Sequence, residues 1–156
     1  MIKTPLSLIR VAAFCLPLAL VASCGPESVP GSTVNIDPAA LGQNTAPSTS
    51  ASISQELFTI ELRSPTAYPQ IDTNLTIDSP GLLYAVDTST TPFTFTQVTV
   101  PHLTTTNSNG VVTVAVSYTS APAATGDVTV ISAFSGTAYG RTNITYTCVA
   151  VAPATC

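Results

Sequence analysis

Charged side chains are scarce in this sequence. Asp, Glu, Lys and Arg together make up 8% of the 156 residues, against roughly a quarter in an average globular protein. Only four residues are Lys or Arg, and tryptophan is absent. So few cations cannot neutralise a row of phosphates, which excludes nucleic acid as a partner. The same scarcity excludes electrostatic attraction to anionic lipids, so any membrane attachment must be covalent.

The residues that acid–base and metal chemistry need are equally sparse. His102, the only histidine, follows Pro101 in an expected exposed loop and has no cysteine or carboxylate near it in sequence. Neither Gly-x-Ser-x-Gly nor Ser-x-x-Lys frames a nucleophilic serine. We interpret the aspartates as turn-capping residues, because they follow no calcium-loop spacing; these are Asp72, Asp78, Asp87 and Asp127. The sequence therefore predicts no enzyme, no metal site and no cofactor.

Long hydrophobic runs are confined to the start of the chain. Val11 to Ala22 is an apolar run of twelve residues, preceded by a segment with Lys3, Arg10 and no acid. That length suits the roughly 7–15 residues of a signal-peptide core and falls short of the ~20 residues that span a bilayer. We therefore expect residues 1–23 to be a signal peptide that is removed on export.

The run ends in Val21-Ala22-Ser23-Cys24, which resembles the lipobox of bacterial lipoproteins. The resemblance implies cleavage before Cys24 and acyl chains on that cysteine. Each buried methylene contributes about 0.8 kcal/mol, so two or three chains hold a protein in the membrane permanently. Gly25, in place of the aspartate that retains some lipoproteins in the inner membrane, favours the outer membrane of the cell envelope. The alternative is an ordinary secretory signal that leaves Cys24 free or disulfide-bonded.

Beyond the signal, the composition divides the chain into three parts. Residues 24–55 hold four prolines and a polar run, so we expect a lipidated N-terminus followed by a flexible tether. Residues 56–148 alternate apolar and polar side chains in short runs that turn residues separate. Residues 149–156 form a tail. Cys148 and Cys156 are an even pair in an oxidising compartment, which predicts a disulfide that closes this tail; a bond from one sulfur to a partner is the alternative.

The alternating runs predict an all-β chain. About seven short strands, with no pattern of helix length, describe an antiparallel β-sandwich. The clearest strands are 111–118, which the Asn109-Gly110 turn opens, and 139–148 near the C-terminus.

Residues 104–148 resemble the closing strands of the bacterial immunoglobulin-like repeats in invasin- and intimin-type surface proteins. The resemblance rests on the segments Asn109–Val116, Gly126–Val130 and Ser135–Ala138. Those repeats commonly carry a D-x-x-G turn before this strand, and here Asn107 stands in place of the aspartate. The resemblance implies that the predicted fold is an immunoglobulin-like β-sandwich of about seven strands, in a surface domain that acts through contact with another protein.

These observations predict a surface-anchored, non-enzymatic lipoprotein module. Its partners would be the membrane, through acyl chains on Cys24, and an unidentified protein, in adhesion or in an envelope assembly. The alternative function is carbohydrate binding by exposed tyrosines. Tyr68 and Tyr139 lie beside turns and are the first candidates for a ligand surface, whereas Tyr118 and Tyr146 fall on apolar faces.

Overall fold

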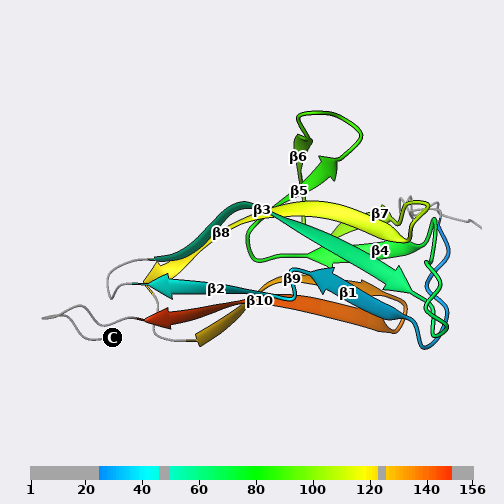
Figure 1. Cartoon of the computed structure of the whole chain (residues 1–156), viewed down its shortest axis with the longest axis horizontal. Helices are drawn as coiled ribbons and strands as arrows, with labels where there is room; N and C mark the ends of the chain where they lie inside the picture. The colour runs from blue at the N-terminus through cyan, green and yellow to red at the C-terminus, as the bar shows by residue number, and fades with distance from the viewer. Residues whose placement is uncertain (1–24, 46–49, 123–125, 149–156) are drawn as a thin grey trace, which may run out of the picture.

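The computed structural model describes residues 25–45, 50–122 and 126–148. All regular secondary structure in these ranges is β, and ten strands form two five-stranded sheets that enclose one hydrophobic core (Figure 1). In the same ranges, no helix has the length and apolar character to cross a membrane. The predicted all-β sandwich is confirmed.

The first sheet is antiparallel throughout. Its strands, in spatial order, are β1 (Thr33–Asp37), β3 (Ser50–Arg63), β8 (Val111–Pro122), β5 (Leu82–Asp87) and β6 (Thr94–Val98). The second sheet contains β2 (Ala40–Thr45), β10 (Ala138–Cys148), β9 (Gly126–Ser135), β4 (Asn74–Asp78) and β7 (His102–Thr105). In this sheet β2 runs parallel to β10, whereas the other described pairs are antiparallel. The sandwich is therefore antiparallel except at one edge.

The strand order matches that of immunoglobulin-type sandwiches. The series β1–β3–β8–β5 corresponds to the ABED sheet of those domains, and β10–β9–β4 corresponds to the GFC sheet. Three strands extend this arrangement: β2 lies beside β10, β6 follows β5 as a hairpin, and β7 joins the second sheet beside β4.

The N-terminal segment is the main correction to the sequence prediction. The expected tether, residues 24–55, is wrong for its described part, which contains β1, β2 and the beginning of β3. Val34 and Ile36 of β1 are each 7% exposed and belong to the core. The chain passes from one sheet to the other at Pro38, which lies between the end of β1 and the start of β2, so this proline interrupts neither strand.

The strand count also changes, from about seven to ten. The seven expected strands correspond to β3, β4, β5, β6, β8, β9 and β10. The three missed strands are β1, β2 and β7. Each of them is short and adjoins a proline or a polar run, and each lies at a sheet edge, where only one neighbour stabilises it.

The core follows from side chains that alternate along each strand. Its fully buried members come from both sheets, and the largest are Phe58, Ile60, Leu62, Leu75, Ile77, Leu83, Ile131 and Ile144. One buried polar group, the Thr142 hydroxyl of β10, donates a hydrogen bond to the carbonyl of Pro38 at 2.9 Å. This bond ties the crossing between β1 and β2 to the second sheet.

If β1 belongs to the core, Ile36→Ala should lower the free energy of unfolding by about 2–5 kcal/mol, because it leaves a cavity between the sheets. The neighbouring exposed residue gives the control: Asn35→Ala should change stability by no more than about 0.5 kcal/mol. Urea denaturation of both variants measures the difference. If the two variants unfold at the same urea concentration, β1 does not contribute to the core and the segment is a tether, as first expected.

Candidate functional site

The β5–β6 hairpin leaves the body of the sandwich (Figure 1). Pairing of β5 with β8 ends at Ala85, but pairing of β5 with β6 continues to Asp87. The Asp87 carboxylate closes the turn by accepting hydrogen bonds from the Ser89 amide at 2.8 Å and the Ser89 hydroxyl at 2.6 Å. These bonds lower the pKa of Asp87 from its ordinary value. The distal part of the hairpin is therefore a two-stranded ribbon supported by its own turn.

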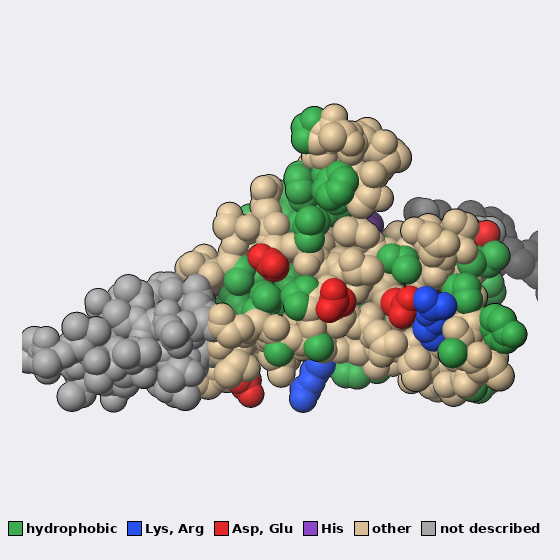
Figure 2. All heavy atoms as spheres, in the orientation of Figure 1, with side chains coloured by type: hydrophobic (Ala, Val, Ile, Leu, Met, Phe, Trp, Pro, Cys, Tyr) green, Lys and Arg blue, Asp and Glu red, His purple; other side chains and the backbone are tan. Residues whose placement is uncertain are grey.

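One face of the hairpin is apolar and exposed. Val86 and Phe95 are cross-strand partners on that face, and Figure 2 shows hydrophobic side chains gathered on the projection. Phe95 is 38% exposed and Phe93 is 44% exposed. Because β6 ends its sheet, one of its backbone edges has no neighbouring strand in the described ranges.

Natural edge strands are usually protected by charges, proline or a bulge. From Thr94 to Val98, β6 contains no charged residue and no proline, and its register with β5 has no irregularity. The hairpin thus combines an unprotected edge with an exposed apolar face, which is a combination suited to another β-strand.

A second apolar row crosses the outer face of the other sheet. Thr76 of β4 pairs with Leu103 of β7 and with Phe134 of β9, and Phe134 pairs with Tyr139 of β10. Leu103 and Phe134 are each 43% exposed, and Tyr139 is 59% exposed. A shallow hollow of about 300 Å³ lies beside Phe134 and includes Glu27 among its lining residues. We call the line Leu103–Thr76–Phe134–Tyr139 the aromatic row.

The two tyrosines predicted as a ligand surface lie on different elements. Tyr139 belongs to the aromatic row, whereas Tyr68 lies in the loop between β3 and β4 and is 72% exposed. The backbone of Tyr68 exchanges two hydrogen bonds with Ser64, one to its amide at 2.9 Å and one to its hydroxyl at 3.1 Å. No described contact joins the two tyrosine rings, so the aromatic neighbour of Tyr139 is Phe134.

Sequence reasoning missed Phe134 because of a bulge. Counting by twos from Val128 and Val130 places Phe134 on the same face as these valines. The register of β9 with β10 shifts at this point: Thr142 pairs with Ile131, and Asn143 pairs with Thr129. The extra residue reverses the alternation. Val130 and Ile131 are therefore both buried, and Phe134 faces outward.

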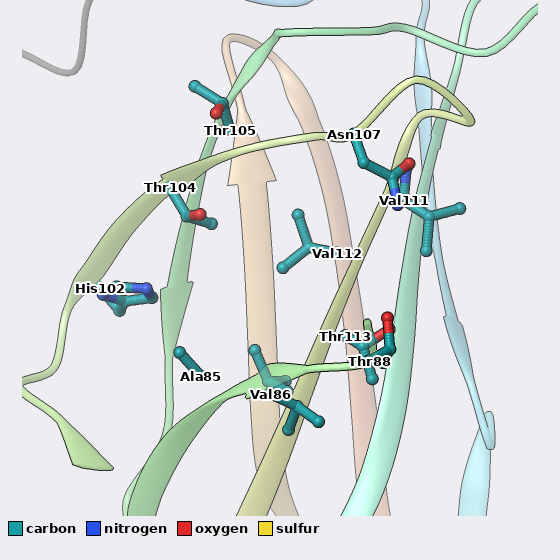
Figure 3. Close-up of a pocket in the computed structure, with 11 residues that line it drawn as sticks. Ala85, Val86, Thr88, His102, Thr104, Thr105, Asn107, Val111, Val112 and Thr113 are labelled. Atoms are coloured by element: carbon teal, nitrogen blue, oxygen red, sulfur yellow. The ribbon is translucent and has the colours of Figure 1, made fainter. Parts of the chain in front are cut away.

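His102 lines a hollow of about 210 Å³ between β5, β7 and β8 (Figure 3). It is the first residue of β7 and is half-buried, so the expectation of an exposed loop residue is wrong. Partial burial lowers its pKa, because desolvation disfavours the imidazolium. The described residues that line the hollow include threonines, valines and Asn107 but no carboxylate or thiol, so His102 has no partner there for acid–base catalysis.

The structure leaves the predicted covalent sites untested. Cys24 and Cys156 lie outside the described residues, and Cys148 is the last residue of β10. Lipid attachment and the Cys148–Cys156 disulfide stay predictions. Within the described ranges, no three His, Cys, Asp or Glu residues form a group that could hold a metal ion.

No family model, curated protein or solved structure matches this chain. Its function must therefore be inferred from the geometry of its own surfaces. The described lining of the hollow at His102 contains no carboxylate or thiol, whereas the hairpin and the aromatic row expose apolar side chains to solvent.

Proposed function

We propose that this chain is a lipoprotein of the bacterial cell envelope whose immunoglobulin-like sandwich binds a protein partner and catalyses no reaction. Acyl chains on Cys24 hold it in the membrane, and the outer membrane is the proposed location. The charged start, the apolar run and the Val21–Cys24 motif support the anchor. The projecting β5–β6 hairpin is the observation that carries the contact function.

The turn before β8 supports the resemblance to bacterial immunoglobulin-like repeats. The Asn107 side-chain oxygen accepts hydrogen bonds from the amides of Asn109 at 2.9 Å and Val111 at 3.1 Å. Gly110 adopts a φ of +71°, and its amide donates to the Asn107 carbonyl at 2.9 Å. An amide oxygen at this position can accept the same bonds as a carboxylate, so the replacement of the aspartate is compatible with the D-x-x-G turn.

The hairpin is suited to bind a protein partner that adds a β-strand to the free edge of β6. An added strand would satisfy the free backbone groups along β6, and its side chains would cover the apolar face around Phe95. A two-stranded ribbon is only marginally stable in water. The part of the hairpin beyond Ala85 would therefore gain stability from a third strand. Backbone pairing with that strand would contribute to the binding free energy in addition to the side-chain contacts.

The anchor predicts that labelled palmitate enters the protein in cells and that Cys24→Ser abolishes the incorporation. Cys15→Ser is the matched control, because Cys15 lies in the expected signal peptide; this variant should incorporate the label normally. Mass spectrometry of the mature N-terminus gives the second readout. An unmodified residue 24 would exclude the anchor and the proposed location.

The hairpin predicts site-specific crosslinking to one protein partner. A photoreactive residue at Gln97 of β6 should yield one stoichiometric adduct in intact envelopes, whereas the same residue at Thr59, which is exposed on the interior strand β3, should yield none. Phe95→Lys should lower the adduct at position 97 at least about tenfold, equivalent to 1.4 kcal/mol of binding free energy. Equal adducts from the two positions, or the absence of any adduct, would exclude the hairpin as the contact surface.

The aromatic row supports a second function, carbohydrate binding. Phe134 and Tyr139 stand side by side on adjacent strands, and the hollow beside Phe134 includes the polar residues Glu27 and Asn74 in its lining. Exposed aromatic faces together with a few polar groups are features of small-ligand sites. The sequence predicted a ligand surface formed by Tyr68 and Tyr139. The carbohydrate surface proposed from the structure is formed by Phe134 and Tyr139.

On a glycan array, Phe134→Ala and Tyr139→Ala should each weaken binding about tenfold or more, a loss of about 1.4 kcal/mol. Tyr68→Ala should bind as the parent does, because Tyr68 lies outside the row. Binding at background level by the parent protein would rule out the carbohydrate function. A loss on Tyr68→Ala alone would show that the row is the wrong surface.

A further inference from the structure

The first described residues are bound to the sandwich. Asn74, the first residue of β4, donates its backbone amide to the Pro26 carbonyl at 2.8 Å and its side-chain amide to the Gly25 carbonyl. Gly25 also fits closely against the loop before β4, since a Cβ atom on it would lie 2.5 Å from the Asp72 carbonyl oxygen. The segment is therefore held from its first described residue onward.

Further contacts continue along the segment. The Ser28 amide donates to the Ser135 hydroxyl at 3.1 Å, and the Ser28 hydroxyl donates to the Ser135 carbonyl at 2.5 Å. The Val29 amide donates to the side-chain oxygen of Gln70 at 3.4 Å. These bonds reach both β9 and the loop between β3 and β4. The segment between Gly25 and β1 is therefore fixed to the sandwich along its length.

The described segment begins one residue after the proposed anchor. Cys24 is joined to Gly25 by one peptide bond, and consecutive Cα atoms across a trans peptide are about 3.8 Å apart. If Cys24 carries lipid, the membrane surface must lie close to Gly25. The end of the sandwich that contains Gly25 and the loops 64–73 and 106–110 is called the basal end.

Three exposed apolar side chains occur on the segments that form the basal end. Val29 is 47% exposed, Ile71 is 51% exposed and Tyr68 is 72% exposed. Figure 2 shows hydrophobic side chains at this end of the molecule. Val29 is linked to Gln70, which directly precedes Ile71, so these residues are close to one another as well as to Gly25.

The loop that carries Tyr68 and Ile71 is braced. The Gln70 amide donates to the Leu62 carbonyl at 3.0 Å, and the Asp72 amide donates to the Thr106 carbonyl at 3.0 Å. The buried Thr106 hydroxyl accepts from the Thr73 amide at 3.0 Å. These bonds fix the backbone of the loop that carries the apolar side chains, so little backbone entropy is lost when the loop meets a surface.

The charges at the basal end favour uncharged lipid. Arg63 forms an ion pair with Glu61, and this pairing lowers the pKa of Glu61 and raises that of Arg63. Glu27 and Asp72 are exposed and acidic. No described cation at this end is left to attract anionic head groups, so a contact here must depend on apolar burial and on interfacial tyrosine.

We propose that the sandwich stands directly on the bilayer, with Val29, Tyr68 and Ile71 in the lipid interface around Cys24. This inference rests on the proposed lipid attachment. The ligand of the basal end is the surface of a zwitterionic membrane. The β5–β6 hairpin, which projects sideways from the long axis (Figure 1), then lies at a fixed height above that surface.

The absence of tryptophan allows a direct test. The full lipoprotein with Tyr68→Trp, reconstituted into phosphatidylcholine vesicles, should lose emission when the acyl chains are brominated near the head group, and its emission should shift to shorter wavelength. Thr119→Trp is the matched control, because Thr119 is exposed on β8 near the end of that strand remote from Gly110. Its emission should not change with bromination. Equal emission with and without bromine for Tyr68→Trp would overturn the inference.

Two further measurements distinguish failure of the membrane contact from failure of the proposed lipid attachment. If the parent incorporates palmitate but Tyr68→Trp is not quenched, the direct contact is wrong and the lipoprotein function stands. If palmitate is not incorporated, the proposed function fails and the contact fails with it. Adding phosphatidylglycerol to the vesicles should not increase the quenching; an increase would contradict the apolar basis of the contact.

Discussion

The attachment of the N-terminal segment to the sandwich is the constraint on which the rest of the structure depends. Hydrogen bonds to Asn74 and Ser135 fix its beginning, and burial of Val34 and Ile36 fixes its middle. At Pro38 the same segment leaves one sheet and joins the other, where β2 lies parallel to β10. A single stretch of chain thereby closes one side of both sheets and determines the distance between the domain and any anchor at Cys24.

The low charge of the chain has a consequence for its surfaces. A surface with few ionic groups must expose hydroxyl and apolar side chains, and scattered apolar residues on it need no functional explanation. The hairpin and the basal end are different because each combines exposed apolar side chains with a second feature. On the hairpin this feature is a free strand edge, and at the basal end it is the covalent proximity of Cys24.

Two small irregularities in the strands decide where side chains point. The bulge at Val130 and Ile131 reverses the alternation of β9 and brings Phe134 to the outer face beside Tyr139. In β5, the loss of pairing with β8 after Ala85 frees the hairpin from the sheet. A shift of one residue in an alternating pattern exchanges buried and exposed positions, so the aromatic row depends on the register of β9, whereas the hairpin depends on where pairing with β8 ends.

The sequence by itself determined the fold class and most of the strands, because alternation of apolar and polar residues is a local property that a sheet with one buried face requires. The scarcity of cations is likewise a property of the sequence alone, since the number of charges in a chain does not depend on how it folds, and it carries the prediction that nucleic acid is not a partner. The tertiary structure alone decided that Val34 and Ile36 are core residues and that Phe134 faces solvent beside Tyr139. These outcomes depend on contacts between residues far apart in the chain, such as Ser28 with Ser135. Neither proline content nor periodicity within one segment carries information about such contacts.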